Sequence, residues 1–180
     1  MTIKRCDWVT DEEIYIKYHD EEWGVPKHDD RELFEMLVLE SFQAGLSWIT
    51  ILKKRENFRI AFDEFDYTKI AKYDEYKIEE LRKNKDIIRH KGKISAAINN
   101  SKIFMEIQEE FGSFDNYIWG FTNRDIIKAE FKTESELSKT ISKDLKKRGM
   151  KFVGPVIIYS YLESIGIINN HQENCFLFSK

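Results

Sequence analysis

An acidic residue on the apolar face of a predicted helix is the feature of this sequence that most clearly suggests chemistry. Glu40 lies seven residues after Leu33 and three after Leu37, so it projects from the same apolar stripe. None of the residues three or four positions away is cationic, and a carboxylate buried without a partner is costly. Gly45 is expected to end this helix and Trp48 to begin the next. A carboxylate and an indole would then flank one tight corner, as in a binding site.

This stretch also has a purely structural interpretation. A buried acid can accept hydrogen bonds from distant backbone or tyrosine groups, and a tryptophan at a helix start usually packs in the core. Perturbed carboxylates mark functional sites only in a statistical sense. The stretch alone therefore favours the structural interpretation over a binding site.

The two cysteines of the chain each stand near a histidine at an opposite end of the sequence. Cys6 and His19 form one pair, and His171 and Cys175, four residues apart, form the other. Two Cys and two His make up the tetrahedral set that structural Zn²⁺ prefers, and four protein ligands leave no open position for catalysis. A metal bound this way would join the two ends of the chain. The alternative is a buried cysteine and a solvated histidine in each pair, and the residues alone favour it because each half-motif is short.

A basic stretch with two glycines follows near the C-terminus. A helix is predicted to end at Gly149, and Gly154 precedes Pro155, which suits the first turn of a new helix that reaches Ile165. A helix, a short hairpin and a second helix can offer free backbone N–H groups to a phosphate. The surrounding charge comes from Lys146, Lys147, Arg148 and Lys151. A hairpin that binds the DNA backbone and an ordinary corner with a solvated basic face are about equally supported by this spacing.

The remaining elements are predicted to be mostly helical, because Gly and Pro are scarce and β-type alternation is hard to find. One helix is predicted from Asp29 or Asp30 to Gly45, and the next from Trp48, capped by Ser47, through Ala61. Shorter helices are predicted within 66–90. A longer helix is predicted from Ile94 past Ile107 to about Gly112, and another short one after the cap Ser113. Lys53, Lys54 and Arg55 are expected on the outer side of the second of these helices. Residues 122–136 are polar and weakly periodic, which indicates a flexible connection.

The overall composition is that of a folded protein of one domain. The chain has 180 residues, of which 42% are hydrophobic and 14% aromatic, enough for a real core. The formal net charge of -3 argues mildly against a nucleic-acid partner, although the distribution of charge matters more than its sum. We find no signal peptide and no apolar run long enough to cross a bilayer, and two cysteines indicate no disulfide framework. We therefore expect a cytoplasmic protein with no membrane partner.

Taken together, these motifs resemble the 3-methyladenine DNA glycosylase I family, the constitutive 3-methyladenine glycosylases. The resemblance covers essentially the whole chain and rests on Tyr15-x-x-Tyr18-His19-Asp20-x-x-Trp23-Gly24-x-Pro26, Leu39-Glu40-x-x-Gln43-Ala44-Gly45-Leu46-Ser47-Trp48, Leu52-Lys53-Lys54-Arg55-Glu56, Ile87-Ile88-Arg89, Gly112-Ser113-Phe114, Leu145-Lys-Lys-Arg-Gly149-x-Lys-Phe-Val-Gly154, Cys6 and His171-x-x-x-Cys175. The sequence departs from the family pattern at Phe42 and Met150, where Gln and Phe are common. It also has Asn170 where an Asp usually precedes the ligand histidine, which weakens an expected partner for His171.

The resemblance implies an all-α helix-hairpin-helix glycosylase fold in which 1–180 form one compact unit. The hairpin region would span about 138–166, and a structural zinc would join segments 1–25 and 165–180. The implied zinc ligands are Cys6, His19, His171 and Cys175. The implied partner is double-stranded alkylated DNA, bound by a monomer.

The resemblance also implies a role for each candidate site residue. Glu40, the candidate catalytic residue, would face the excised base, and Trp48 would stack on it. Tyr18 would add a hydrogen bond and an aromatic wall, with Trp8, Tyr15 and Trp23 nearby. Leu46, next to Gly45 at the tip of the corner, would wedge into the gap left by the extruded nucleotide. The hairpin would hold phosphates through Arg148, Gly149, Lys151 and Gly154.

The chemistry of the implied substrate explains why little catalytic machinery is needed. Adenine methylated at N3 is cationic while still attached to the sugar, so it is already a good leaving group. Members of the wider superfamily that the resemblance implies usually carry a catalytic Asp after the hairpin. Segment 156–170 of this sequence contains no Asp, and its one acid is Glu163. We therefore expect a monofunctional hydrolase without lyase activity. The alternatives are a non-enzymatic, zinc-clipped helical module that binds DNA, a small-molecule hydrolase that uses zinc, and a glycosylase that also excises 3-methylguanine.

Overall fold

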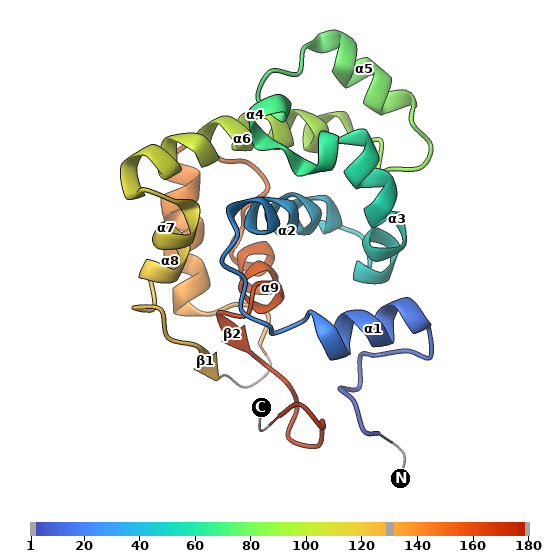
Figure 1. Cartoon of the computed structure of the whole chain (residues 1–180), viewed down its shortest axis with the longest axis vertical. Helices are drawn as coiled ribbons and strands as arrows, with labels where there is room; N and C mark the ends of the chain where they lie inside the picture. The colour runs from blue at the N-terminus through green and yellow to red at the C-terminus, as the bar shows by residue number, and fades with distance from the viewer. Residues whose placement is uncertain (1–2, 129–131, 179–180) are drawn as a thin grey trace.

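Helix α2 (Asp30–Gln43) lies at the centre of the molecule and is buried around nearly its whole circumference. The computed structural model describes residues 3–128 and 132–178 of the 180-residue chain. Ten consecutive residues of α2, from 33 to 42, are buried, because α3, α6, α7 and α9 all pack against it (Figure 1). Glu40 therefore lies in the core of the protein and not merely at the edge of an apolar stripe.

The other elements surround α2 in chain order. Their bounds are α1 (Glu13–Glu21), α3 (Trp48–Ala61), the 3-10 turn η1 (Asp63–Phe65), α4 (Tyr67–Ile70), α5 (Glu75–Lys83), α6 (Lys91–Phe111), α7 (Phe114–Gly120), β1 (Ile127–Lys128), α8 (Glu136–Lys147), α9 (Pro155–Ser164) and β2 (Ile168–Asn169). Helix α9 packs between α8 and α2, and the long helix α6 contacts α2, α4, α5 and α7. The expectation of a mostly helical protein is confirmed.

Local sequence signals set several helix ends as predicted. The side chain of Asp29 accepts hydrogen bonds from the amides of Arg31 and Glu32, at 3.0 and 3.1 Å, and so caps α2. Gly112 adopts a φ of 85° at the end of α6, a conformation that favours glycine. Ser113 caps α7 by accepting from the amide of Asn116 at 2.9 Å. These ends were predictable because each cap is encoded within a few residues.

Two expectations about the remaining chain require correction. The segment predicted as a flexible connection, 122–136, contains strand β1, which pairs in parallel with β2 through Ile127 and Ile168, so the described chain is not purely α. Residues 129–131 of that segment lie outside the described residues. Arg55 is not on an outer face, because its guanidinium is largely buried between Glu22 and Glu35.

The two ends of the described chain lie together at one end of the molecule (Figure 1). The amide of Phe176 donates to the carbonyl of Lys4 at 2.9 Å, and the amide of Asp7 donates to Oε1 of Gln172 at 2.7 Å. The cysteines and histidines at the two ends of the sequence are thereby brought within reach of each other.

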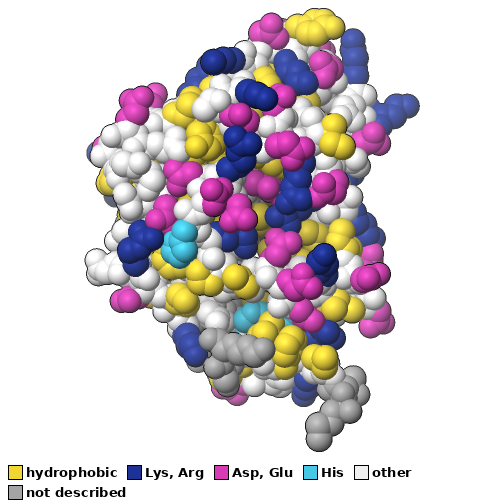
Figure 2. All heavy atoms as spheres, in the orientation of Figure 1, with side chains coloured by type: hydrophobic (Ala, Val, Ile, Leu, Met, Phe, Trp, Pro, Cys, Tyr) yellow, Lys and Arg dark blue, Asp and Glu magenta, His cyan; other side chains and the backbone are white. Residues whose placement is uncertain are grey.

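The face shown in Figure 2 carries acidic and basic side chains interspersed over its surface, with no large area of one sign. None of the helices in the described part of the chain combines the length and the apolar character that crossing a membrane requires.

Candidate functional site

A cavity of about 270 Å³ opens beside the corner between α2 and α3. This volume is close to the lower end of the range for small-molecule sites, about 300–1,000 Å³. The lining residues come from α1, α2, α3, α9 and the segments flanking α1: Trp8, Tyr15, Tyr18, Trp23, Glu40, Gln43, Trp48, Ser160 and Glu163. The structure thus brings together all six residues for which sequence analysis expected a role in recognising the base.

The aromatic side chains form the walls of this cavity. The rings of Tyr18 and Trp48 lie with centroids 5.4 Å apart and planes at 49°. Trp8 lies 5.0 Å from both Tyr15 and Trp23, which extends the aromatic surface away from α3. The indole Nε1 of Trp48 is buried without a hydrogen-bond partner among the described residues. The cavity therefore offers flat apolar surfaces together with a donor that is free to bind a ligand.

Glu40 brings an unpaired carboxyl into this aromatic cavity. Its side chain is 3% exposed, and its Oε2 has no hydrogen-bond partner within the described chain. Burial, reinforced by the nearby charge of Glu163, raises the pKa of Glu40 well above its ordinary value. The second buried acid of α2 behaves differently, because Glu35 Oε1 lies 2.6 Å from Nε of Arg55 and also pairs with Arg59. The protein therefore neutralises one acid of this helix and leaves the other available to a ligand.

Two residues of α9 contribute to the cavity, although sequence analysis did not place them there. Ser160 and Glu163 are three residues apart, so they share one face of the helix. Burial raises the pKa of Glu163 to about 7, opposed by a hydrogen bond from Asn170. Their spacing was visible in the sequence. That this face of α9 meets α2 was not, because the contact joins segments more than a hundred residues apart.

The raised pKa of Glu163 predicts a specific dependence of stability on pH. Between pH 4.5, the ordinary value, and about 7, the folded state retains a proton that the unfolded state has lost. The contribution of Glu163 to the free energy of unfolding is therefore fully present below pH 4.5 and is lost as the pH rises to about 7. The total change is about 3 kcal/mol. We expect Glu163→Gln to reduce the fall in unfolding free energy between pH 5 and pH 8, measured by urea denaturation. Equal falls in both proteins would contradict this prediction.

The corner that joins α2 to α3 is held by a buried lysine that sequence analysis missed. Lys93, at the start of α6, donates from Nζ to the carbonyls of Phe42 and Ala44, at 2.8 and 2.6 Å. These are C-terminal carbonyls of α2, which lack partners within the helix. Burial lowers the pKa of Lys93. Nothing in the local sequence distinguishes this lysine from the basic residues around it.

The corner itself has the form that the glycine predicted. Gly45 has a φ of 79°, and the side chain of Leu46 is 41% exposed at the tip, where a wedge would need to be. Ser47 occupies the position before the first turn of α3, but its hydroxyl bonds to that of Thr50 at 2.7 Å and caps no backbone amide. The predicted start of the helix at Trp48 is confirmed, and the predicted side-chain cap is wrong.

Replacing Lys93 with methionine is expected to loosen this corner. The change removes two charge-assisted hydrogen bonds, and we expect the free energy of unfolding to fall by about 2 kcal/mol. Because Leu46 and Trp48 depend on the position of the corner, the excision from duplex DNA that the sequence resemblance implies should fall more than binding of a free base. Thermal unfolding and single-turnover kinetics measure the two effects. Lys91→Met is the control, since Lys91 lies two residues earlier and pairs with Glu75 on the surface; equal effects of both substitutions would contradict the assignment.

The basic hairpin between α8 and α9 is held from several sides. Gly149 has a φ of 101°, and Gly154 with Pro155 begins α9 as the sequence predicted. The side chain of Asn100 bonds to both the N–H and the carbonyl of Lys151, each at 2.9 Å. Further side chains bind the hairpin carbonyls: Asn99 at Gly149, Ser41 at Phe152 and Ser142 at Val153. The hairpin is therefore a rigid part of the surface.

Only part of the hairpin backbone is free to bind a ligand. The amides of Arg148, Gly149, Met150 and Lys151 are all used within the protein, which corrects the expectation that the whole hairpin offers free N–H groups. Among the described residues, the amides of the next three positions, 152–154, have no internal acceptor. A phosphate would therefore have to bind at the second half of the hairpin, where α9 begins.

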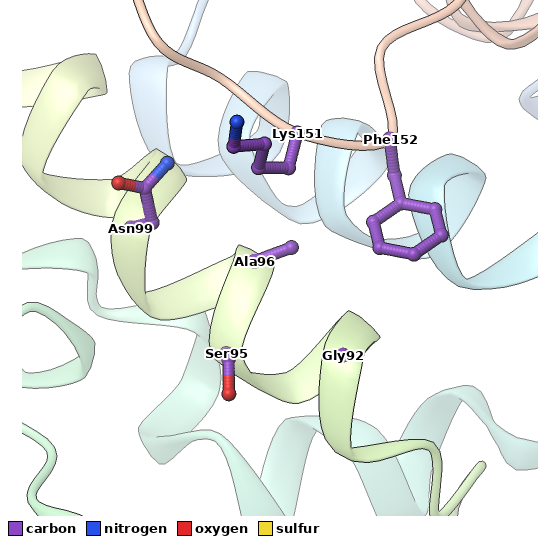
Figure 3. A pocket seen from close by; sticks show the side chains of 6 residues that line it. All are labelled: Gly92, Ser95, Ala96, Asn99, Lys151 and Phe152. Atoms are coloured by element: carbon purple, nitrogen blue, oxygen red, sulfur yellow. The ribbon is translucent and has the colours of Figure 1, made fainter.

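The basic side chains of the hairpin differ in whether they are free to bind an anion. Arg148 binds Glu110 and Asp144, at 2.6 and 2.8 Å, so two carboxylates already neutralise it. Lys151 forms no ion pair within the described chain, and it borders a hollow of about 480 Å³ between the hairpin and α6. Figure 3 shows the side chains that line this hollow, with Lys151 and Phe152 on the hairpin opposite Gly92, Ser95, Ala96 and Asn99 on α6. Lys151 is therefore better placed than Arg148 to meet an anion.

The four predicted metal ligands form one buried cluster. The possible ligand atoms of Cys6, His19, His171 and Cys175 all lie within 4.8 Å of one another. The nearest sulfur-to-nitrogen distances are 3.5 Å from Cys175 to His19 and 3.6 Å from each cysteine to His171. Zinc bonds of about 2.3 Å to sulfur and 2.0 Å to nitrogen give edges of about 3.5 Å in a tetrahedron. The donor set and its spacing therefore fit zinc.

Neighbouring groups orient both histidines of this cluster. Nδ1 of His19 bonds to Asp20 at 2.7 Å, and Arg5 holds that carboxylate. His171 bonds to the backbone carbonyl of Trp23, and burial lowers its pKa to about 4. A neutral imidazole with its second nitrogen engaged is the form that binds zinc. Asn170 does not orient this ring, because its amide donates to Tyr159 and Glu163.

Comparisons with known proteins agree with this geometry. A family model described as methyladenine glycosylase matches residues 8–178. DNA-3-methyladenine glycosylase 1 of Escherichia coli (strain K12) is 44% identical over 179 residues, which cover 96% of each chain. A crystal structure of a 3-methyladenine DNA glycosylase I has a TM-score of 0.94 and 45% identity, covering 97% of this chain and 99% of that one. The structure of a variant of such an enzyme in complex with 3-methyladenine has a TM-score of 0.92 and 35% identity, covering 96% of each chain.

The family model spans nearly the whole chain, and the identity to the E. coli protein extends over almost the full length of both proteins. The aromatic cavity and the basic hairpin lie within the residues matched by the family model, as do His19, His171 and Cys175 of the Cys/His cluster. The chain therefore belongs to the methyladenine glycosylase family.

Proposed function

We propose that this protein is a DNA glycosylase of base excision repair that hydrolyses the N-glycosidic bond of 3-methyladenine in alkylated DNA. The observation that carries the proposal is the carboxyl of Glu40, buried without a counterion in an aromatic cavity. The relatives named above are DNA-3-methyladenine glycosylases, and one related structure contains 3-methyladenine. A cationic base is the ligand that such a cavity binds better than any neutral one.

The cavity residues recognise the extruded base in complementary ways. Trp48 stacks on the cationic ring, an interaction worth about 2 kcal/mol when desolvated. Glu40 accepts a hydrogen bond from the exocyclic amine, and Tyr18 adds a polar contact at the ring edge. The remaining walls are Trp8, Tyr15 and Trp23. Ordinary adenine is neutral and gains no comparable stacking energy, so charge and methyl shape together select the damaged base.

The corner and the hairpin position the DNA around this cavity. Leu46 fills the gap that the extruded nucleotide leaves in the duplex, supported by Gly45 at the turn. The hairpin holds the DNA backbone through Lys151 and through the free amides of residues 152–154, which end at Gly154. Arg148 and Gly149 shape the first half of the hairpin. Extrusion costs a few kcal/mol and is easiest where the lesion has already weakened stacking. We infer that one copy of the chain acts on double-stranded alkylated DNA.

The reaction needs little help beyond positioning, because the cationic base takes both electrons of the C1′–N9 bond as it leaves and needs no enzyme acid to protonate it. Water adds to the deoxyribose at C1′ and releases one proton to the solvent, and the base departs as neutral 3-methyladenine. The described residues that line the cavity include no lysine, so no Schiff base with the sugar is expected. The metal fits Cys6, His19, His171 and Cys175, and when bound it joins the two chain ends and supplies no chemistry to the reaction.

Chromatography of bases released from methylated DNA tests this function. Duplex DNA treated with dimethyl sulfate should release free 3-methyladenine in proportion to the enzyme added, and untreated DNA should release no base. Reduction with borohydride during the reaction should trap no protein on the DNA. Tight binding of the duplex without any released base would instead support the alternative of a zinc-clipped, non-enzymatic DNA-binding module.

A further inference from the structure

A second acid shares the base cavity with Glu40 and has no counterion either. Glu163 reaches the cavity from α9 and is 7% exposed, whereas Glu40 reaches it from α2. Within the described parts of the chain, no lysine, arginine or histidine forms an ion pair with either carboxyl. The cavity therefore contains two carboxyl groups whose charge nothing in the described protein balances.

A neutral amide holds Glu163 in place. Nδ2 of Asn170 donates to Oε2 of Glu163 at 3.1 Å and to the hydroxyl of Tyr159 at 3.2 Å. The Oδ1 atom of Asn170 is buried and has no partner among the described residues. This bond orients the carboxyl without neutralising it. A glutamine at 163 would meet the same structural need, because its amide can donate to the unpartnered oxygen of Asn170.

Among the described residues, the titratable groups that interact electrostatically with Glu163 are acids and tyrosines. Glu40 approaches from α2, Tyr18 from α1 and Tyr159 from one turn earlier on α9. Burial raises the pKa of both carboxyls, and the like charge of Glu163 raises that of Glu40 further. The entry of a cation reverses this penalty, since it favours the ionised form of both acids. A neutral ligand provides no such compensation.

We propose that Glu163 is a specificity-determining residue of the base cavity, where it acts with Glu40 to select purines that carry a positive charge. This inference rests on the proposed function and deepens it. The charge to be recognised is that of the methylated base while it is still bonded to deoxyribose, because such a base is cationic until it leaves. A neutral base gains no such attraction, since it does not favour the ionised form of either acid.

Two ligands that differ in charge but not in shape test this inference. The 3,9-dimethyladeninium ion carries the fixed charge of a 3-methylated base whose N9 is still substituted. Its 3-deaza isostere has carbon in place of N3, so it keeps both methyl groups and is neutral. Isothermal titration at pH 8 gives the dissociation constant of each. We expect Glu163→Gln to lower the preference for the cation about tenfold, with little change for the neutral ligand.

Control variants separate charge selection from a structural role. Glu56→Gln removes the same charge from an exposed position on α3 and should leave the preference unchanged. Glu163→Met removes the charge without leaving a buried amide, and it should show the same loss of preference as Glu163→Gln. An unchanged preference in either folded variant would overturn the inference. Failure of both variants to fold would also overturn it, because Glu163 would then be structural.

The same experiments distinguish this inference from the proposed function. A wild-type protein that releases 3-methyladenine from DNA but binds both ligands equally would overturn charge selection by Glu163 and leave the glycosylase activity in place. A wild-type protein that releases no base would refute the proposed function itself.

Discussion

Glu40→Gln is expected to lower single-turnover excision of 3-methyladenine from duplex DNA by about 100-fold, which corresponds to about 3 kcal/mol. The amide keeps the size of the side chain but removes the negative charge that faces the base. A charge-assisted hydrogen bond in a buried site contributes about 1.5–3 kcal/mol, and the attraction between carboxylate and cationic ring adds to it. Because the proposed role of Glu40 is recognition of the base, binding of free 3-methyladenine should weaken as well.

The other buried acid of α2 provides a matched control for this variant. Glu35→Gln removes the partner of Arg55 and Arg59, and we expect it to lower the free energy of unfolding by about 3 kcal/mol. Its excision rate per folded molecule should not change, because Glu35 does not line the cavity. Glu40→Gln should show the opposite pattern, with stability maintained or increased and activity lost. Complete loss of cleavage by Glu40→Gln with unchanged binding of the base would contradict this account and make Glu40 catalytic in the strict sense.

The second large effect is expected from the Cys/His cluster. Cys175→Ser should abolish stoichiometric zinc, measured by plasma mass spectrometry, and lower the melting temperature by on the order of 10 °C. The cluster joins chain ends that otherwise share few backbone hydrogen bonds, so its binding energy contributes directly to folding. Glu173→Gln, an exposed change in the same C-terminal segment, is the control and should have no effect.

The consequences for activity distinguish a structural metal from a catalytic one. Trp8 and Trp23 line the aromatic cavity and also pack on the two histidines of the Cys/His cluster. The ring centroids of Trp23 and His171 lie 4.7 Å apart, and those of Trp8 and His19 lie 5.2 Å apart. Loss of the metal should therefore weaken base binding while the cleavage step at saturating DNA continues below the melting temperature. Abolished cleavage in a folded, DNA-bound variant would indicate catalytic zinc. Unchanged melting together with unchanged metal content would show that Cys175 is not a ligand.

The parts of the fold and site that were predictable from sequence are those encoded locally. Glu40 and Trp48 could be placed on one corner because helix periodicity, a glycine and a helix start lie within nine residues. The turn at Gly149 and the start of α9 at Pro155 followed from residue types with strong backbone preferences. The grouping of Cys6 with His171 was a hypothesis based on residue type, and the structure brings the two together.

The parts that were not predictable depend on contacts between distant segments. Glu163 enters the cavity because α9 packs against α2, and Lys93 reaches the end of α2 because α6 crosses it. Arg55 looked like a surface residue by periodicity, but Glu22 and Glu35 draw it inward. The short parallel pairing of β1 with β2 likewise has no local signal, since two residues per strand are too few for an alternating pattern.

A crystal structure of the protein with 3-methyladenine tests the central claim most directly. We predict that the base lies in the cavity with its ring stacked on Trp48 and its exocyclic amine within hydrogen-bond distance of the Glu40 carboxyl. A base found elsewhere, such as in the hollow beside the hairpin, or bound in the cavity without contact to Glu40, would contradict the account.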